Sequence, residues 1–241
     1  MDIRALSQKI ASVLDLTALG DQETEQTTAL LCQKALLPVG GVAAVCVWPW
    51  YVSLSKRLLK GSNVRVATVV NFPKGTDDLL SVQKEIMQVL QDGADEIDMV
   101  FPYHAYLDNN QDDAFSFVGA CKKQCDKKTL LKVIMETGEF PNILSLKEAA
   151  KGILDAGADF LKTSTGKVPV GATPEAANAL LEVIRETKTG AGLKVSGGIS
   201  SCRQARDYII LASVIMGEKW VYKDHFRIGA SRLLDDVLKN L

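Results

Sequence analysis

Cysteine and histidine are scarce in this 241-residue sequence, and neither forms a pattern that binds metal. The five cysteines are an odd number without a Cys-x-x-Cys pair, which argues against a disulfide framework and predicts a reducing, cytoplasmic location. Cys121 and Cys125 share one helical face, but His104 and His225 are the only histidines. Because these ligands have no suitable spacing, we expect no metal site.

The sequence also lacks an excess of charge of either sign. Lys and Arg number 28 and Asp and Glu 29, for a net charge of -1, so nothing points to nucleic acid or to an anionic membrane as a partner. Hydrophobic residues make up 47% and charged residues 24%. That balance excludes a disordered chain and is typical of a soluble globular protein.

An uninterrupted membrane-spanning run is missing as well. The charges at Asp2 and Arg4 are unlike the apolar core of a signal peptide. Residues 35–55 carry no charge, but Gly40 and Pro49 interrupt them and would leave backbone amides unsatisfied in lipid. We therefore expect a buried strand with its turns here, and no membrane partner.

Short apolar or β-branched runs alternate with segments of helical period along most of the chain. The runs predict strands at Val42–Val47, Val64–Val70, Glu96–Val100, Leu130–Met135, Phe160–Lys162, Leu193–Val195, Val214–Met216 and Phe226–Gly229. The periodic segments between them predict helices at Thr76–Gln91, Asp112–Lys127, Ser145–Ala156 and Pro174–Glu186. Two earlier helices, Ile3–Val13 and Glu23–Leu36, precede the first predicted strand and would lie outside the repeat.

Glycine turns join several helices to the strands that follow. Gly93, Gly157 and Gly190 each stand shortly before a predicted strand, where glycine adopts the left-handed backbone that ends a helix. Strand, helix and turn at about thirty-residue spacing is the βαβ pattern of a parallel sheet. We predict one α/β domain over residues 1–241, a (β/α)8 TIM barrel with extra N-terminal helices. An open doubly wound sheet is the alternative, because alternation alone does not show closure.

Ionisable residues occur in strands that a barrel would bury on both faces. Asp98, Lys162 and Lys194 lie in or just after three such runs, and Lys132 and Glu136 belong to a fourth. Each alone could be half of a buried ion pair. Their placement at corresponding ends of different strands favours a catalytic site, because barrel active sites collect residues from several strand ends.

Two lysines and a carboxylate in such positions suggest Schiff-base chemistry. A lysine amine attacks an aldehyde only when deprotonated, and at a pKa of about 10.4 under one in a thousand is deprotonated at pH 7. A second ammonium about 5 Å away lowers that pKa by about two units at an effective dielectric near 20. The carboxylate would hold the second lysine protonated and pass protons through water. These residues alone do not decide which lysine is the nucleophile.

Glycine and hydroxyl motifs suggest a phosphate site. Ser196-Gly197-Gly198 and Gly229-Ala230-Ser231 each follow a strand and open a helix, where bare backbone amides bind anions. Ordinary tight turns are the alternative. The segment Thr163–Lys167 is not a nucleotide-binding loop, because Val168 follows its lysine.

In these same segments the sequence closely resembles the deoxyribose-phosphate aldolases, over nearly its whole length. The shared landmarks are VCV at 45–47, ATVVNFP at 67–73, GADEID at 93–98, KVIMETG at 132–138, GADFLKTSTG at 157–166 and KVSGG at 194–198. The resemblance implies a (β/α)8 barrel that reversibly cleaves 2-deoxy-D-ribose 5-phosphate to acetaldehyde and D-glyceraldehyde 3-phosphate. It implies neither a metal nor an organic cofactor, and it suggests a homodimer.

The resemblance also implies a role for each site residue. Lys162 becomes the Schiff-base nucleophile, Lys194 the neighbouring charge that lowers its pKa, and Asp98 the acid/base partner. The residues it places around the substrate phosphate are Gly166, Gly197, Gly198, Gly229 and Ser231, and those along the sugar path are Asp15, Thr17, Thr165 and Lys167. Cys46 lies beside the site, with a core thiol as its alternative role.

Three features depart from these aldolases. Arg232 stands where relatives often carry a second small hydroxyl residue, Trp48-Pro49-Trp50 replaces a more basic segment, and the chain stops at Leu241 without a tyrosine-ended tail.

Two other functions are alternatives to the aldolase. A sugar-phosphate sensor would not need a depressed amine, and another phosphosugar lyase or isomerase would want a metal cluster or a Glu/His base pair.

Overall fold

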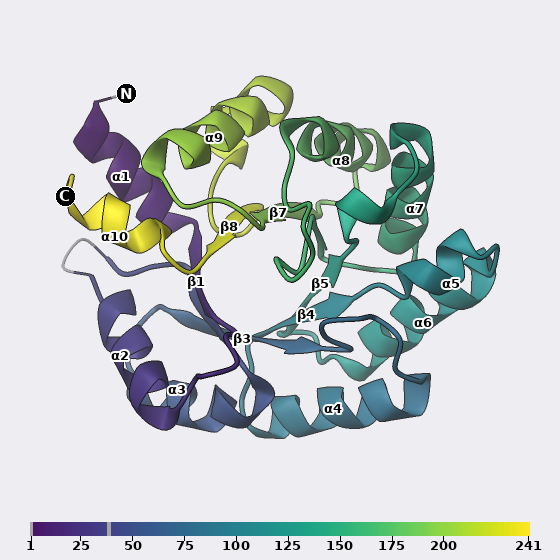
Figure 1. Cartoon of the computed structure of the whole chain (residues 1–241), viewed down its shortest axis with the longest axis horizontal. Helices are drawn as coiled ribbons and strands as arrows, with labels where there is room; N and C mark the ends of the chain where they lie inside the picture. Colours follow the sequence, from purple (N-terminus) through teal and green to yellow (C-terminus); the bar gives the residue numbers. More distant parts are fainter. Residues whose placement is uncertain (1, 38–39) are drawn as a thin grey trace.

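Eight parallel strands form a closed barrel in the computed structural model, which describes residues 2–37 and 40–241 (Figure 1). The strands are β1 (Leu14–Ala18), β2 (Ala44–Val47), β3 (Arg65–Val70), β4 (Glu96–Val100), β5 (Leu130–Ile134), β6 (Phe160–Lys162), β7 (Gly192–Ser196) and β8 (Phe226–Ala230). Each pairs with the next in sequence, and β8 pairs with β1. The predicted (β/α)8 TIM barrel is confirmed.

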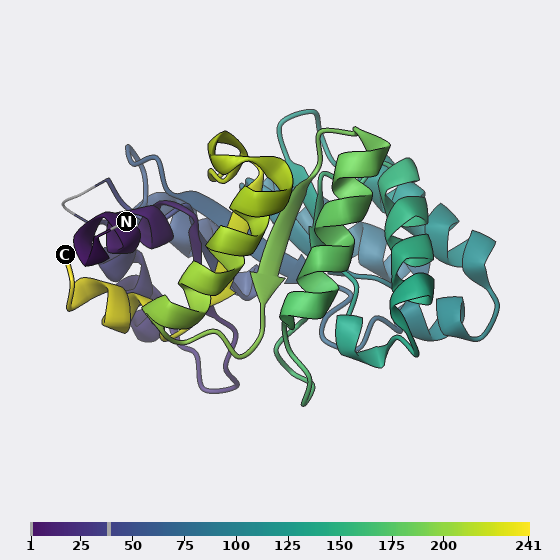
Figure 2. The same cartoon turned by 90° about the horizontal axis from the view of Figure 1, so that it is seen from above.

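Helices cover the outside of this barrel on all sides (Figure 1). The α-helices are α1 (Ile3–Ser12), α2 (Glu25–Ala35), α3 (Val52–Leu58), α4 (Leu79–Gln91), α5 (Tyr103–Leu107), α6 (Gln111–Gln124), α7 (Ile143–Asp155), α8 (Pro174–Thr187), α9 (Cys202–Met216) and α10 (Leu233–Leu238). Short 3-10 turns occur at Pro49–Tyr51, Thr137–Glu139 and Glu218–Trp220. Figure 2 shows α7, α8 and α9 side by side along the barrel wall. No helix in the described ranges is long and apolar enough to cross a membrane.

The start of the barrel differs from the prediction. Leu14–Ala18 is the first strand, so only α1 precedes the barrel, and α2 is the crossover between β1 and β2. The expectation of two extra N-terminal helices is therefore wrong for the second one. This strand escaped notice because it is five residues long and carries Asp15 and Thr17 among its apolar residues.

The predicted strand at Val214–Met216 is also wrong. These residues form the last turn of α9, which begins at a capping box made by Ser201 and Gln204 and ends at Gly217 with φ +92°. A run of three apolar residues is too short to tell strand from helix, and here the helical period of the longer segment prevails. One missed strand and one false strand leave the predicted total of eight unchanged.

Local signals at other helix ends have the predicted effect. Gly93, Gly157 and Gly190 have φ values of +95°, +100° and +79°, the left-handed backbone that ends a helix. Thr173 accepts a hydrogen bond from the amide of Ala176 at the start of α8, directly before Pro174. The three glycines therefore turn the chain toward the next strand, and Thr173 fixes the start of α8.

Strand register brings the charged residues to neighbouring positions inside the barrel. Asp98 pairs with Lys132, Lys162 with Lys194, and Lys194 with Arg227. Since paired residues of parallel strands point to the same face, these side chains share the interior. A small apolar cluster fills the space beside them, made of Leu19, Ala44, Cys46, Ala67 and Val69. The larger hydrophobic core lies between the strands and the helices.

Candidate active site

A cluster of seven ionisable side chains occupies the barrel interior. Its members are Asp15, Glu96, Asp98, Lys132, Lys162, Lys194 and Arg227, and each is at most 3% exposed. A buried charge without a partner costs several kcal/mol, so a cluster of this size persists only if its members neutralise one another. We call this set the buried charge cluster.

Asp98 is the centre of the buried charge cluster. Its Oδ2 atom accepts hydrogen bonds from the Nζ atoms of Lys162 and Lys194, each at 2.7 Å. Its Oδ1 atom accepts one from Lys132 Nζ at 2.8 Å. Because Lys162 and Lys194 share one oxygen, their nitrogen atoms lie within twice that bond length of each other. The structure therefore brings together the two lysines and the carboxylate that the sequence singled out.

Lys162 is the lysine of this group whose pKa is lowered. Burial is the largest cause, because it disfavours the ammonium form, and the positive charge of Lys194 acts in the same direction. The carboxylate of Asp98 opposes both effects without overcoming them. The second ammonium contributes as expected from the sequence, but desolvation outweighs it.

The partners of Lys162 stay charged. Burial alone would lower the pKa of Lys194, but the carboxylates of Asp15 and Asp98 outweigh it and raise that pKa above the ordinary lysine value. Burial would likewise raise the pKa of Asp98, yet Lys132, Lys162 and Lys194 hold it well below the usual range. Asp98 is thus an anion and Lys194 a cation at neutral pH.

A second tier of the cluster lies below these residues. Lys194 Nζ forms a 2.6 Å ion pair with Asp15, whose other oxygen accepts a 2.5 Å hydrogen bond from Arg227. Arg227 also donates to both oxygens of Glu96, which in turn forms a 2.6 Å ion pair with Lys132. Sequence reasoning missed Arg227 and Glu96. The signal that identified Asp98 would have found them, because both are ionisable residues on buried strands.

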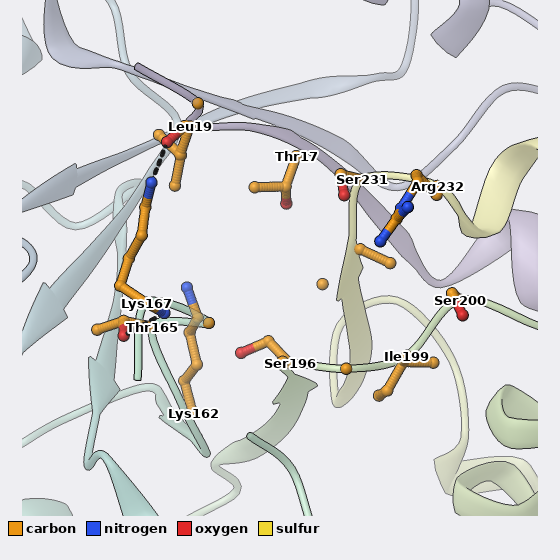
Figure 3. A pocket seen from close by; sticks show the side chains of 16 residues that line it. Thr17, Leu19, Lys162, Thr165, Lys167, Ser196, Ile199, Ser200, Ser231 and Arg232 are labelled. Carbon is orange, nitrogen blue, oxygen red and sulfur yellow. Dashed lines mark hydrogen bonds between the residues drawn. The ribbon is translucent and has the colours of Figure 1, made fainter. Parts of the chain in front are cut away.

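A cavity of about 310 Å³ opens above Lys162, bordered by residues from the C-terminal ends of β1, β6, β7 and β8 (Figure 3). The predicted site residues that line it are Thr17, Lys162, Thr165, Gly166, Lys167, Gly197, Gly198, Gly229 and Ser231. Asp98 and Lys194 lie beneath its floor within the buried charge cluster. Asp15 and Cys46 are fully buried and do not line it.

The wall opposite Lys162 in Figure 3 is built for an anion. It carries Ser231 and Arg232, and Gly197 and Gly198, whose φ values are +95° and +82°, also line the cavity. At Gly197 a Cβ atom would lie 2.8 Å from the Cα of Gly171, so a side chain does not fit there. This wall combines bare backbone amides, a hydroxyl and a guanidinium, which are the groups that bind phosphate.

Gly229 has a packing role as well. A Cβ atom there would lie 2.9 Å from Cε of Lys194 and 3.0 Å from Cβ of Ser196. The absence of a side chain at Gly229 therefore leaves room for the Lys194 side chain to reach Asp98.

Glu136 holds the loop that follows Lys162. Its buried carboxylate accepts 2.5 Å hydrogen bonds from the hydroxyls of Ser164 and Thr165, and weaker ones from the amide of Thr165. The backbone of Glu136 has φ +55°, an uncommon conformation for a non-glycine residue. The Ser164 hydroxyl in turn accepts a hydrogen bond from the amide of Gly166. Glu136 thus fixes the cavity wall formed by Thr165 and Gly166.

An aromatic pair from the segment Trp48-Pro49-Trp50 lies beside Lys167, which lines the cavity. Trp48 and Trp50 stack with ring centroids 5.1 Å apart. The Nζ atom of Lys167 lies 5.9 Å from the Trp48 ring centroid and donates a 2.7 Å hydrogen bond to the carbonyl of Leu19. These contacts tie the β6–α8 loop to the loops after β1 and β2.

Cys46 and the remaining cysteines are thiols. Burial raises the pKa of Cys46, so it is neutral beside Asp98 and Lys194. No three His, Cys, Asp or Glu side chains come together as a metal site would require, within residues 2–37 and 40–241. A metal-free site stays a prediction.

One family model and several solved structures that are similar to this chain are described as aldolases. A family model described as DeoC/LacD family aldolase matches residues 2–231. A Toxoplasma gondii protein, provisionally assigned as a deoxyribose-phosphate aldolase, is 28% identical with a TM-score of 0.89, covering 99% of this chain and 96% of that one. A provisionally assigned deoxyribose-phosphate aldolase from Coccidioides immitis is 29% identical with a TM-score of 0.85, covering 97% and 86%. The deoxyribose phosphate aldolase from Aeropyrum pernix, a tetramer, is 26% identical with a TM-score of 0.76, covering 99% and 96%.

A barrel with a buried lysine that lines a cavity at the C-terminal ends of its strands has the architecture expected of a Schiff-base aldolase. The family match spans nearly the whole chain. The protein belongs to the DeoC/LacD family of aldolases.

Proposed function

We propose that the protein cleaves 2-deoxy-D-ribose 5-phosphate reversibly to acetaldehyde and D-glyceraldehyde 3-phosphate, with Lys162 as the nucleophile. The observation that carries the proposal is the position of Lys162. It lines the cavity, its pKa is lowered, and Ser231 and Arg232 lie across the cavity from it. Lys132 and Lys194 are buried beneath and stay paired with carboxylates.

The reaction begins when the neutral amine of Lys162 attacks the aldehyde carbon of the open-chain sugar. The hydroxyl of the resulting carbinolamine takes up a proton and leaves as water, which gives a protonated imine that draws electrons from the C2–C3 bond. The proton is returned when the imine is finally hydrolysed. The bond between C2 and C3 breaks, the C3 hydroxyl loses its proton, and glyceraldehyde 3-phosphate leaves. The electron pair of the broken bond forms an enamine on Lys162. A proton added at C2 restores the imine, and one water molecule hydrolyses it to acetaldehyde and the amine.

Asp98 and Lys194 handle the charges and protons of these steps. The Asp98 carboxylate stabilises the protonated imine, since it already contacts the Lys162 nitrogen. It is a weak base because of its lowered pKa, so it passes a proton onward rather than keeping it. Lys194 keeps its own proton and maintains a positive charge beside Lys162.

The phosphate of the substrate binds at the wall formed by Gly197, Gly198, Ser231 and Arg232. This orientation directs the sugar aldehyde toward Lys162, on the opposite side of the cavity in Figure 3. Thr17, Thr165 and Lys167 line the space between and contact the sugar hydroxyls. We further propose a cytoplasmic enzyme that acts as a homodimer.

Trapping the imine tests the proposal. The protein is incubated with acetaldehyde, reduced with borohydride and digested, and the modified lysine is located by mass spectrometry. We expect an ethyl adduct on Lys162 that is lost in Lys162→Ala, together with acetaldehyde release from deoxyribose 5-phosphate. Lys147→Met is the matched control, since Lys147 pairs with Glu182 on the surface. Binding of deoxyribose 5-phosphate without an adduct on Lys162 would contradict the aldolase and favour a sensor.

A further inference from the structure

The charges of the buried charge cluster balance only when Lys162 is neutral. The three carboxylates are Asp15, Glu96 and Asp98, and the three lasting cations are Lys132, Lys194 and Arg227. A proton on Lys162 adds a seventh charge and leaves a net charge of +1 inside the barrel. Because an uncompensated charge is costly in a buried environment, this count favours the neutral amine.

We propose that Arg227 and Glu96 are positioning residues that set the protonation of Lys162 from a distance, by fixing the net charge of the cluster at zero. The proposal rests on the proposed function, because it takes Lys162 as the nucleophile. Neither residue lines the cavity. Both therefore act through other residues and not by contact with the substrate.

The contacts of Arg227 connect it to Lys162 in four steps. Arg227 donates to Asp15, Asp15 pairs with Lys194, Lys194 donates to Asp98, and Asp98 accepts from Lys162, with distances between 2.5 and 2.7 Å. Arg227 thereby orients one oxygen of Asp15 and leaves the other for Lys194.

Glu96 belongs to the same tier. It accepts two hydrogen bonds from Arg227 and forms a 2.6 Å ion pair with Lys132. The guanidinium carbon of Arg227 also lies 5.9 Å from the centroid of the Phe160 ring. The ring contact and the ion pairs together fix the positions of Arg227 and Glu96, neither of which lines the cavity.

The other titratable neighbours do not alter the charge count. Cys46 on β2 faces the cluster as a neutral thiol, since burial raises its pKa. Arg65 on β3 donates to Glu96 at 3.1 Å and to Asp224 at 3.0 Å. Arg65 and Asp224 are partly exposed and neutralise each other at the outer edge. The buried carboxylate of Glu136 accepts hydrogen bonds from Ser164 and Thr165 outside this network, so the balance is counted over the seven residues that direct contacts join.

Below the pKa of Lys162, kcat/KM falls as the pH falls, and we call this part of the pH profile the acid limb. Removing one charge should move the acid limb in a direction given by the sign of the charge removed. Loss of the Arg227 cation favours a proton on Lys162, so the limb of kcat/KM moves to higher pH in Arg227→Met. Loss of the Glu96 anion has the opposite effect, so the limb moves to lower pH in Glu96→Gln. A unit charge roughly 10 Å away at an effective dielectric near 20 shifts a pKa by about one unit.

The experiment measures kcat/KM for deoxyribose 5-phosphate cleavage against pH, with borohydride trapping on Lys162 at each pH. The variants are Arg227→Met, Glu96→Gln, the double variant carrying both changes, and Arg227→Lys. We expect shifts of about one pH unit in opposite directions for the two single variants. The double variant restores the balance and returns the limb close to its original position, and Arg227→Lys keeps the charge and leaves the limb in place.

A purely structural role for the pair would lower activity or melting temperature in every variant without moving the limb. That result, with the adduct still on Lys162, would overturn the proposal. If one single variant does not fold, the other keeps the test decisive, because each has an expected shift of definite sign. An absent Lys162 adduct in the unaltered protein would instead overturn the proposed function, so the two failures are distinguishable.

Discussion

Lys162 and Lys194 show how environment separates two identical side chains. Both donate to the same oxygen of Asp98, but only Lys194 also pairs with Asp15. One additional carboxylate raises the pKa of Lys194, whereas burial and the charge of Lys194 lower that of Lys162. The sequence shows two lysines on two strands and does not choose between them. The choice depends on Asp15, which lies on β1 and is far from both lysines in the sequence.

Substitution of Lys194 tests this difference. In Lys194→Met the cluster loses a cation, so Lys162 regains its proton and Asp15 and Asp98 lose a shared partner. We expect kcat/KM for deoxyribose 5-phosphate cleavage to fall by about 100-fold or more at pH 7. The rate of acetaldehyde release measures the effect, and a thermal melt checks the fold. Near-normal turnover by the folded variant would be inconsistent with the role assigned to Lys194.

Arg232 is the residue that should set the preference for a phosphorylated substrate. In Arg232→Ser one charge-assisted contact to the phosphate is lost, so we expect KM for deoxyribose 5-phosphate to rise about tenfold with little change in kcat. Cleavage of unphosphorylated deoxyribose serves as the internal control and should not change. An equal loss on both sugars would show that Arg232 does not contact the phosphate.

At the scale of elements, strand ends and their loops shape the cavity. Lys162 is the last residue of β6, and the next residues turn over the barrel mouth, where Glu136 at the end of β5 holds them. The sequence placed Glu136 beside Lys132 on one strand. It did not reveal that Glu136 binds Ser164 and Thr165 and not the buried charge cluster, because these hydrogen bonds join residues 28 and 29 positions apart.

Glu136→Asp should loosen this loop without changing the charge of the site. An aspartate keeps both acceptor oxygens but is one methylene shorter, so it does not reach both hydroxyls. We expect KM for deoxyribose 5-phosphate to rise severalfold, while the acid limb of the pH profile stays in place. Glu139→Asp, at an exposed neighbour, is the matched control. A shifted limb in Glu136→Asp would assign the residue to the proton chemistry instead.

Much of the element order could be predicted, for physical reasons that also explain the errors. Helix caps such as Thr173 and turns such as Gly93 act locally, so they can be recognised in sequence. The strand Leu14–Ala18 carries Asp15, whose burial is made possible by Arg227 and Lys194, and no local pattern reports those partners. The strand expected at Val214–Met216 failed because three β-branched or apolar residues fit either structure.

At the scale of the whole molecule, the barrel interior holds a set of buried charges that neutralise one another. Its inner strands carry Asp98, Lys162 and Lys194, which could be predicted from the rule that buried ionisable residues need a reason. The same rule applied to β8 and to the start of β4 would have predicted Arg227 and Glu96. Whether the charges cancel is beyond sequence reading, because the count depends on which side chains face the interior.

Acid should destabilise the protein through this interior. The pKa values of Asp15, Glu96 and Asp98 are lowered in the folded state, mainly by the cations of Lys132, Lys194 and Arg227 overcoming burial. Groups with lowered pKa values stabilise the fold above their unfolded values of about 4, and this contribution is lost as pH falls.

We therefore expect the melting temperature to be nearly constant from about pH 8 to 5 and to drop steeply below about pH 4. Thermal denaturation followed by circular dichroism gives the profile. Glu96→Gln should show a shallower decline, since one of these carboxylates is gone. A melting temperature that rises on acidification would contradict the charged state assigned to the cluster.

The central claim is that Lys162 alone, among the buried lysines, gives up its proton well below the ordinary lysine value. The most direct measurement is the rate of imine formation with acetaldehyde against pH, trapped by borohydride and located by mass spectrometry in the unaltered protein. We predict a midpoint clearly below about 10.4, with the adduct confined to Lys162. A midpoint at or above that value, or an adduct on Lys132 or Lys194, would contradict the account.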